Sequence, residues 1–150
     1  MLYKELKPGV SADRVQEAST PNFSGNNIRS KTEAIPDGKY LEIWMANIPF
    51  RADSHVQCGD RPVIIISNDE INEISSVVSV VPLTTRIKQL WMKSHVPLNG
   101  HGLRYPSMVL VEQVTTIDKR QLRFRIGQIS TKNDVVEIKK ALINHMGLMA

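Results

Sequence analysis

Arg61 and Thr84 each stand at one end of an apolar run, where a polar side chain can take part in chemistry. Arg61 follows the polar stretch RADSHVQCGD and opens the run PVIII, whereas Thr84 closes the run VVSVVPLT. A guanidinium fixed by the strand behind it can hold a phosphate through paired hydrogen bonds. If both runs are strands, their ends can meet at one rim of a barrel. Each feature alone is more often structural, so further support is needed.

The segment from Pro82 to Arg104 contains no acidic residue. Basic and aromatic side chains alternate along it, namely Arg86, Lys88, Trp91, Lys93, His95 and Arg104. Basic side chains attract a nucleic-acid backbone and aromatic rings stack on unpaired bases, so the pattern is typical of single-stranded RNA binding. A solvated basic hairpin with Trp91 packed inward is an equal alternative. A second basic run, from Lys119 to Arg125, slightly favours the RNA interpretation.

Several enzyme classes find no support in the sequence. It has no HExxH, no Walker-type GxxxxGK and no GxGxxG motif, so metal, nucleotide and dinucleotide enzymes are not indicated and no cofactor is expected. The single cysteine, Cys58, offers neither a disulfide framework nor a zinc cluster. The four histidines stand alone in the sequence, which favours structural or exposed roles. Only His55 combines chemistry that suits proton transfer with a place in the stretch before Arg61.

Composition predicts one ordinary globular domain. The chain has 150 residues, of which 41% are hydrophobic and 23% charged. A net charge of +4 permits a polyanionic partner without requiring one. Because the N-terminus lacks a secretory signal and no long apolar run is present, we expect a cytoplasmic protein that does not associate with membranes.

Short, β-branched segments dominate the chain after residue 39 and predict a small barrel. The expected strands cover residues 40–48, 61–69, 77–83, 94–98, 107–117 and 124–130. The near-continuous apolar runs VIII and VVSVV are typical of strands buried on both faces. The run VLVEQVTTI mixes polar and apolar positions, as a half-exposed strand does.

The last segment changes to helical periodicity. Val135, Ile138, Leu142 and Met146 recur at helical spacing, and Thr131 can cap the start of the helix together with Asp134. We therefore expect an amphipathic helix over residues 132–146 whose apolar stripe closes the barrel.

Residues 1–38 are rich in Ser, Asn, Pro and Gly and predict a flexible N-terminal extension with one short helix near residues 11–18. Residues 39–150 then form the folded domain.

Four segments in the same order and spacing resemble the MazF/PemK/Kid family of toxin endoribonucleases. They are RPVIIISND, VVPLT, SHVPL and SMVLVEQVTTIDKRQL, which start at residues 61, 80, 94 and 107. IGQIS and the C-terminal helix continue the resemblance, which covers residues 41–148. It implies a CcdB/PemK-type, SH3-like barrel with a C-terminal helix and a homodimer whose RNA groove follows the subunit interface. It also implies a MazE-like antitoxin on the same surface, with operator DNA bound through the antitoxin complex.

The resemblance assigns the catalytic arginine to Arg61 and the catalytic threonine to Thr84. Without a metal, the neighbouring ribose 2′-hydroxyl is the best nucleophile, which leaves a 2′,3′-cyclic phosphate and a 5′-hydroxyl and makes cleavage specific for RNA. Such cleavage of mRNA would inhibit translation and growth. The general base is not assigned, since arginine stays protonated and a threonine hydroxyl is a poor base. The candidate RNA contacts are Ser54, His55, Gln57, Arg86, Lys88 and Lys93.

Two departures from the family pattern are visible. Many relatives carry a Gly-Asp pair before the first strand, where this chain has Leu41 and Glu42, and the loop before Arg61 is one residue out of step with some relatives.

Two other functions share the expected fold. A CcdB-like gyrase poison binds a protein without chemistry and depends on a tryptophan near its C-terminus, whereas Trp44 and Trp91 lie far upstream here. A catalytically silent member would only bind nucleic acid or regulate its own operon, and the presence of Arg61 and Thr84 argues against it.

Overall fold

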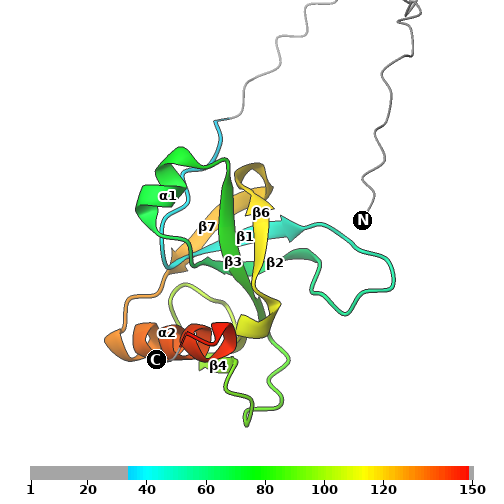
Figure 1. Ribbon diagram of the computed structural model, residues 1–150, viewed down its shortest axis with the longest axis vertical. Coiled ribbons are helices and arrows are strands. Elements are labelled where there is room, and N and C mark those ends of the chain that lie inside the picture. The colour runs from blue at the N-terminus through cyan, green and yellow to red at the C-terminus, as the bar shows by residue number, and fades with distance from the viewer. Residues whose placement is uncertain (1–33, 149–150) are drawn as a thin grey trace, which may run out of the picture. The chain divides into compact units, whose positions relative to one another are not determined.

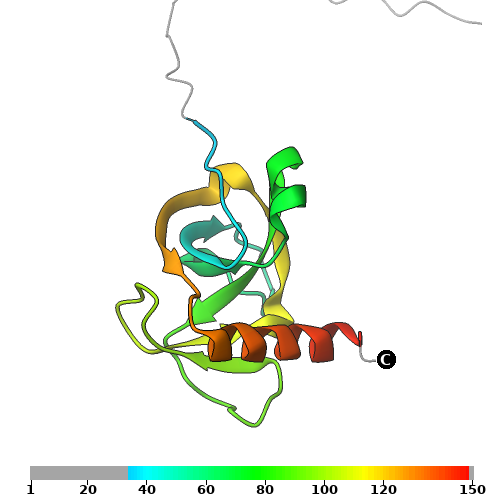
Figure 2. The ribbon, with the colours of Figure 1, turned by 90° about the vertical axis from the view of Figure 1, so that its left-hand side faces the viewer.

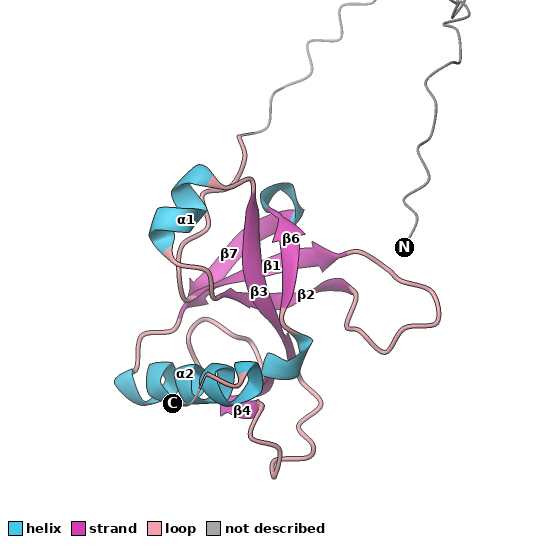
Figure 3. Cartoon of the chain, viewed as in Figure 1, coloured by secondary structure: helices cyan, strands magenta, loops and turns pink. Residues whose placement is uncertain are grey.

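The computed structural model describes residues 34–148, so the short helix expected near residues 11–18 lies outside the described residues. The described part consists of an antiparallel sheet, two α-helices and two short 3-10 helices (Figures 1 and 3). In chain order the elements are β1 (Glu42–Ile48), β2 (Gly59–Ile65), α1 (Asp69–Ile74), β3 (Val77–Thr84), β4 (His95–Leu98), β5 (Ser107–Leu110), η1 (Val111–Gln113), β6 (Thr115–Asp118), η2 (Lys119–Gln121), β7 (Leu122–Gln128) and α2 (Lys132–Met146).

The sheet has the strand order β4-β5-β3-β2-β1-β7, with β6 paired to β3 outside this path. All its pairs are antiparallel. The ends of this path, β4 and β7, are not paired to each other, so the sheet is barrel-like without being closed. The predicted fold class, mainly β with a C-terminal helix, is confirmed. None of the helices in residues 34–148 is long and apolar enough to cross a membrane.

The central strands are buried on both faces, as their apolar runs predicted. Val63 and Ile65 belong to one core cluster, whereas Ile64 between them belongs to the other. Side chains alternate between the faces of a strand, so a continuous apolar run fills both cores. Val80 and Val81 on β3 repeat this division.

Helix α2 covers one of these cores and has the predicted bounds (Figure 2). The Thr131 side chain accepts the backbone N–H of Asp134, and Gly147 ends the helix in the left-handed conformation that favours glycine. Ile138 is fully buried in the core. The predicted stripe is wrong at its end, because Met146 is 57% exposed.

The expected strand over residues 107–117 is wrong, because the chain forms β5, η1 and β6 instead. Leu83 of β3 lies opposite Val109, but Val80, three residues earlier, lies opposite Thr115 instead of residue 112. The register on β3 therefore shifts by three residues, and the turn η1 takes up the extra length.

Helix α1 was not predicted. Its N-cap Asn68 accepts the backbone N–H of Ile71 at 2.9 Å, and Asp69 and Glu70 occupy its first turn. An asparagine followed by two acidic residues is a helix-start signal, but the helix that begins here is only six residues long.

Candidate active site

Arg61 lies on β2, opposite Ala46 of β1, and its guanidinium is held by its own loop. The Nε and Nη2 groups donate to the carbonyl oxygen of Cys58 at 3.0 and 2.6 Å. The Nη1 group donates to the carboxamide oxygen of Gln57. A guanidinium has five N–H groups, so one remains on each terminal nitrogen. Arg61 is half-buried, which leaves this outer pair able to receive a phosphate.

Thr84 lies at the same end of the sheet as Arg61. Val63 of β2 and Pro82 of β3 form the last pair between these strands, and Arg61 and Thr84 each lie two residues beyond it. Pairing stops before that point because Pro62 has no N–H with which to continue the ladder. Since side chains repeat every two residues, Arg61 and Thr84 leave the same face.

The Thr84 hydroxyl keeps its proton free to donate. Its oxygen accepts the backbone N–H of Arg86 at 3.1 Å, which uses a lone pair and not the hydroxyl hydrogen. Thr84 is half-buried, and its backbone pairs with Met108 of β5. The two positions that the sequence suggested for chemistry therefore lie at the same end of the sheet, each with unused donors.

The β1–β2 loop (residues 49–58) carries three of the candidate RNA contacts. Ser54 and His55 are exposed, and the Ser54 hydroxyl accepts the backbone N–H of Val56 at 3.1 Å. Gln57 is half-buried, and its side chain points to Arg61. Its backbone N–H donates to the carboxamide oxygen of Gln113 at 3.2 Å. RNA contact by these three residues stays a prediction.

The β3–β4 connection (residues 85–94) carries the other three, Arg86, Lys88 and Lys93, all exposed. Trp91 on the same connection is 80% exposed, so the alternative in which it packs inward is wrong. The connection thus presents basic groups and an aromatic ring to solvent, as stacking on unpaired bases requires.

His95 anchors the β3–β4 connection. Its side chain is 3% exposed, its Nδ1 lies 3.1 Å from the carbonyl oxygens of both Lys88 and Gln89, and its Nε2 lies 2.8 Å from a Glu112 carboxylate oxygen. These contacts hold the ring between the β3–β4 connection and η1. A nearly buried side chain with these contacts agrees with the structural role expected of a lone histidine.

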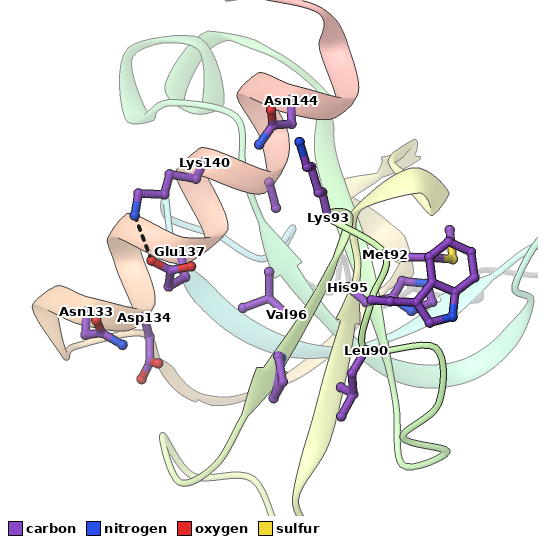
Figure 4. A pocket seen from close by; sticks show the side chains of 13 residues that line it. Leu90, Met92, Lys93, His95, Val96, Asn133, Asp134, Glu137, Lys140 and Asn144 are labelled. Carbon is purple, nitrogen blue, oxygen red and sulfur yellow. Dashed lines mark hydrogen bonds and ion pairs between the residues drawn. The ribbon is translucent and has the colours of Figure 1, made fainter.

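A groove of about 450 Å³ separates the β3–β4 connection from α2 (Figure 4). Lys93 lines it from one side and Glu137, Lys140 and Asn144 from the helix. Lys140 and Glu137 pair with each other at 3.0 Å. The groove therefore offers groups of both charges, unlike the purely basic face of the connection.

The second basic run, residues 119–125, does not form a free basic patch. Lys119 is buried and donates to the carbonyl oxygen of Asn72. Arg120 pairs with Asp118 and lowers the pKa of that carboxyl to about 2. Arg125 pairs with Glu42 at 2.7 Å. The slight support that this run lent to RNA binding is withdrawn.

Sequence reasoning missed the residues that hold the site. Glu112 and Gln113 were taken for the polar positions of a half-exposed strand, whereas they lie side by side on η1 and fasten the two candidate RNA-binding segments. The available signal was two adjacent polar residues within an apolar run. Within residues 34–148, no group of three or more His, Cys, Asp or Glu side chains could hold a metal ion.

An antiparallel sheet with a C-terminal helix over one core is the fold that the motifs implied. The family described as PemK-like, MazF-like toxin of type II toxin-antitoxin system matches residues 39–146, and the chain belongs to this family.

Among named relatives, Endoribonuclease MazF of Staphylococcus saprophyticus is 35% identical over 94 residues, which cover 61% of this chain and 78% of the relative. Its name states the enzyme class that the motifs implied.

Solved structures share the fold. Mycobacterium tuberculosis toxin MazF-mt6 has a TM-score of 0.60 at 24% identity, covering 73% of this chain and 99% of that one. MazF from Deinococcus radiodurans has a TM-score of 0.64 at 21% identity, covering 75% and 98%. An endoribonuclease from a mycobacterial species, solved in complex with its cognate antitoxin, has a TM-score of 0.63 at 21% identity, covering 75% and 98%.

Proposed function

We propose that the chain is a sequence-specific endoribonuclease toxin that cleaves single-stranded RNA and thereby inhibits translation and growth. The observation that carries the proposal is the Arg61 guanidinium, held by its own loop with one N–H left on each terminal nitrogen, at the end of the sheet where Thr84 closes β3. Membership in the toxin family and the name of the staphylococcal relative support the same activity.

The proposed reaction takes its nucleophile from the substrate. The ribose 2′-hydroxyl loses its proton and its oxygen forms a bond to phosphorus as the bond to the 5′-oxygen breaks. The departing 5′-oxygen takes up one proton, so the products are a 2′,3′-cyclic phosphate and a 5′-hydroxyl with no net change in protons. Arg61 donates two hydrogen bonds to the phosphate oxygens as charge builds on them, and Thr84 donates one more. Each such donor contributes about 3 kcal/mol, or on the order of a hundredfold in rate.

The exposed groups of the two loops give the substrate its path in this proposal. Arg86, Lys88 and Lys93 attract the backbone, and Trp91 offers a ring for stacking on an unpaired base. Ser54 and His55 face solvent on the loop before Arg61 and contact the RNA from the other side.

The partners in this proposal are a second copy of the chain and a cognate antitoxin. Their support is family membership and a neighbour solved with its cognate antitoxin. Binding of operator DNA then requires the antitoxin complex. Sedimentation of the purified chain checks the dimer, and copurification with the product of an adjacent gene checks the antitoxin.

The test is incubation of the purified chain with long single-stranded RNA in EDTA, followed by mapping of new 5′ ends. Discrete cuts with 5′-hydroxyl ends should appear in the wild type and fall about a hundredfold or more in Arg61→Ala and in Thr84→Val. Arg120→Ala is the matched control, since it removes the same charge from an exposed side chain. Asp118, the partner of Arg120, lies opposite Val77 of β3. Val77 is seven residues before Thr84 on this strand, a distance of about 23 Å.

Intact RNA across several unrelated transcripts would sink the proposal. A gyrase poison would then be favoured if the chain inhibits DNA supercoiling by gyrase, and a silent regulatory member if it does not.

A further inference from the structure

We propose that Gln113 is a positioning residue for Arg61 and acts through Gln57. The expected effect on the rate of RNA cleavage rests on the proposed function. The effect on how the Arg61 guanidinium is held does not. The inference joins residues that are 56 positions apart in the chain.

Gln113 stands on a firmly anchored turn. Val111, at the start of η1, is fully buried, and its backbone N–H donates to the carbonyl oxygen of Ser94 at 3.0 Å. The turn closes with the N–H of Val114 on the carbonyl oxygen of Val111 at 3.1 Å. The strands before and after it, β5 and β6, both pair with β3. The Gln113 side chain therefore starts from a backbone that the core holds in place.

At the other end of the Gln57–Gln113 hydrogen bond lies the β1–β2 loop, which makes few contacts with the rest of the domain. Residues 49–56 are exposed, and the side chains of Asn47 and Asp60 join at its base at 2.8 Å. The Gln57 backbone N–H donates to the Gln113 carboxamide oxygen, which pins the last turn of the loop against η1. Because the acceptors for Arg61 are the Gln57 side chain and the Cys58 carbonyl, this bond sets where both acceptors stand.

The outer N–H pair of Arg61 depends on those two acceptors. Three N–H groups are engaged by residues 57 and 58, which fixes the guanidinium plane and leaves one N–H on each terminal nitrogen. Without the bond to Gln113, the loop end and both acceptors can shift, and the guanidinium follows them. A misplacement of about 1 Å at a reacting centre can cost up to a hundredfold in rate.

Gln121 provides a matched control for Gln113. It lies on the other 3-10 helix, η2, and its carboxamide oxygen accepts the backbone N–H of Asp118 at 2.9 Å. The bond is thus of the same kind, but it lies at the opposite end of β3 from Thr84.

The experiment compares full-length Gln113→Ala, Gln113→Glu and Gln121→Ala with the wild type. Exchange of the Gln57 amide and the Arg61 Nε–H is followed by nitrogen-15 NMR, and single-turnover cleavage by gel. In Gln113→Ala, both groups should exchange about tenfold faster or more, and the cleavage rate should fall about tenfold with less than about a twofold change in RNA affinity. Gln113→Glu keeps an acceptor oxygen and should restore slow exchange and most of the rate.

Gln121→Ala should speed exchange of the Asp118 amide alone and leave the rate unchanged. A cycle with Arg61→Ala adds a second measure, since a residue that acts through Arg61 has no further effect once Arg61 is gone. Unchanged Arg61 Nε–H exchange in Gln113→Ala, or rate losses that add in the double variant, would overturn the inference. If the wild type cleaves no RNA, the proposed function fails, while the exchange data still decide whether Gln113 holds Arg61.

Discussion

At the scale of single residues, the positive charge of Arg61 and the planar shape of its guanidinium make different contributions. Any cation at this position would attract a phosphate, but only a planar fork can be braced on one side by Gln57 and Cys58 and still offer two N–H groups on the other. Under the proposed function the requirement for arginine is therefore geometric, and it can be tested apart from the requirement for charge.

Arg61→Lys keeps the charge and removes the fork. We expect affinity for an RNA with a 2′-deoxy group at the cleaved position to change less than about threefold, while the cleavage rate falls about a hundredfold. Fluorescence anisotropy and single-turnover kinetics measure the two quantities. A lysine variant that cleaves as fast as the wild type would mean that charge alone is sufficient.

Leu41 has a φ of 62°, a backbone conformation that suits the glycine which the family resemblance led us to expect here. This left-handed conformation is free of strain only for glycine and costs about 1 kcal/mol for other residues. Leu41 offsets the cost by burying its side chain in the core under α2, and its backbone N–H bonds to Ile65 at 2.8 Å.

The backbone strain at Leu41 predicts an unusual order of stability. Both Leu41→Ala and Leu41→Gly lose core packing, about 2–5 kcal/mol. Glycine alone relieves the strain, so the glycine variant should be more stable than the alanine variant by about 1 kcal/mol, the reverse of the order in ordinary strands. Urea unfolding of the two variants checks this, and an alanine variant that is the more stable one contradicts it.

At the scale of elements, the start of α2 is held by a small polar cluster. Asp134 accepts hydrogen bonds from the Thr131 hydroxyl and from His101 Nε2, the latter at 2.8 Å. These bonds, that of Thr131 first, hold the pKa of Asp134 below its usual value of 3.8. His101 comes from the connection between β4 and β5, so the cluster joins the helix to the sheet.

The lowered pKa of Asp134 predicts an acid-dependent contribution to stability. The unfolded chain binds the proton more readily than the folded chain, so stability rises with pH across this titration. The contribution is complete above about pH 5 and is lost as pH falls below 3.8 and through the folded value. Asp134→Asn should therefore be less stable than the wild type at pH 7, with a gap that narrows in acid. Urea titrations at both ends of the range measure it, and a gap independent of pH would refute the assignment.

At the scale of the whole molecule, β3 is the strand on which the site is assembled. It pairs with β2, which carries Arg61, and with β5 and β6, which flank the turn η1. The three-residue register shift on β3 creates that turn, and Glu112 and Gln113 on it fasten the two candidate RNA-binding segments. One irregularity in the sheet thus sets the position of both loops.

The division of the chain into an extension and a domain also makes a prediction at this scale. The family match begins at residue 39 and β1 at Glu42, so a shortened chain that starts at residue 34 retains every described element. We expect it to unfold within about 1 kcal/mol of the full chain and to cleave RNA at a similar rate. A large loss of either property would show that residues 1–33 take part in folding or in the site.

The sequence by itself determined β2, β3 and α2 and suggested the two candidate catalytic positions. Apolar runs of β-branched residues define β2 and β3, and helical spacing with a Thr131 cap defines α2, because these patterns are local and a short window contains them. The motifs around Arg61 and Thr84 supplied the family for the same reason.

Only the tertiary structure decided what holds the site. The bonds from Gln113 to Gln57 and from Glu112 to His95 join residues 56 and 17 positions apart, and no periodicity relates such partners. The same holds for the second basic run, where pairing with Asp118 and Glu42 removed two of the charges that the sequence presented as free. Local patterns indicate the strands and helices, whereas the pairing register decides which polar groups come into contact. On β3 that register shifts by three residues between its pairing with β6 and its pairing with β5.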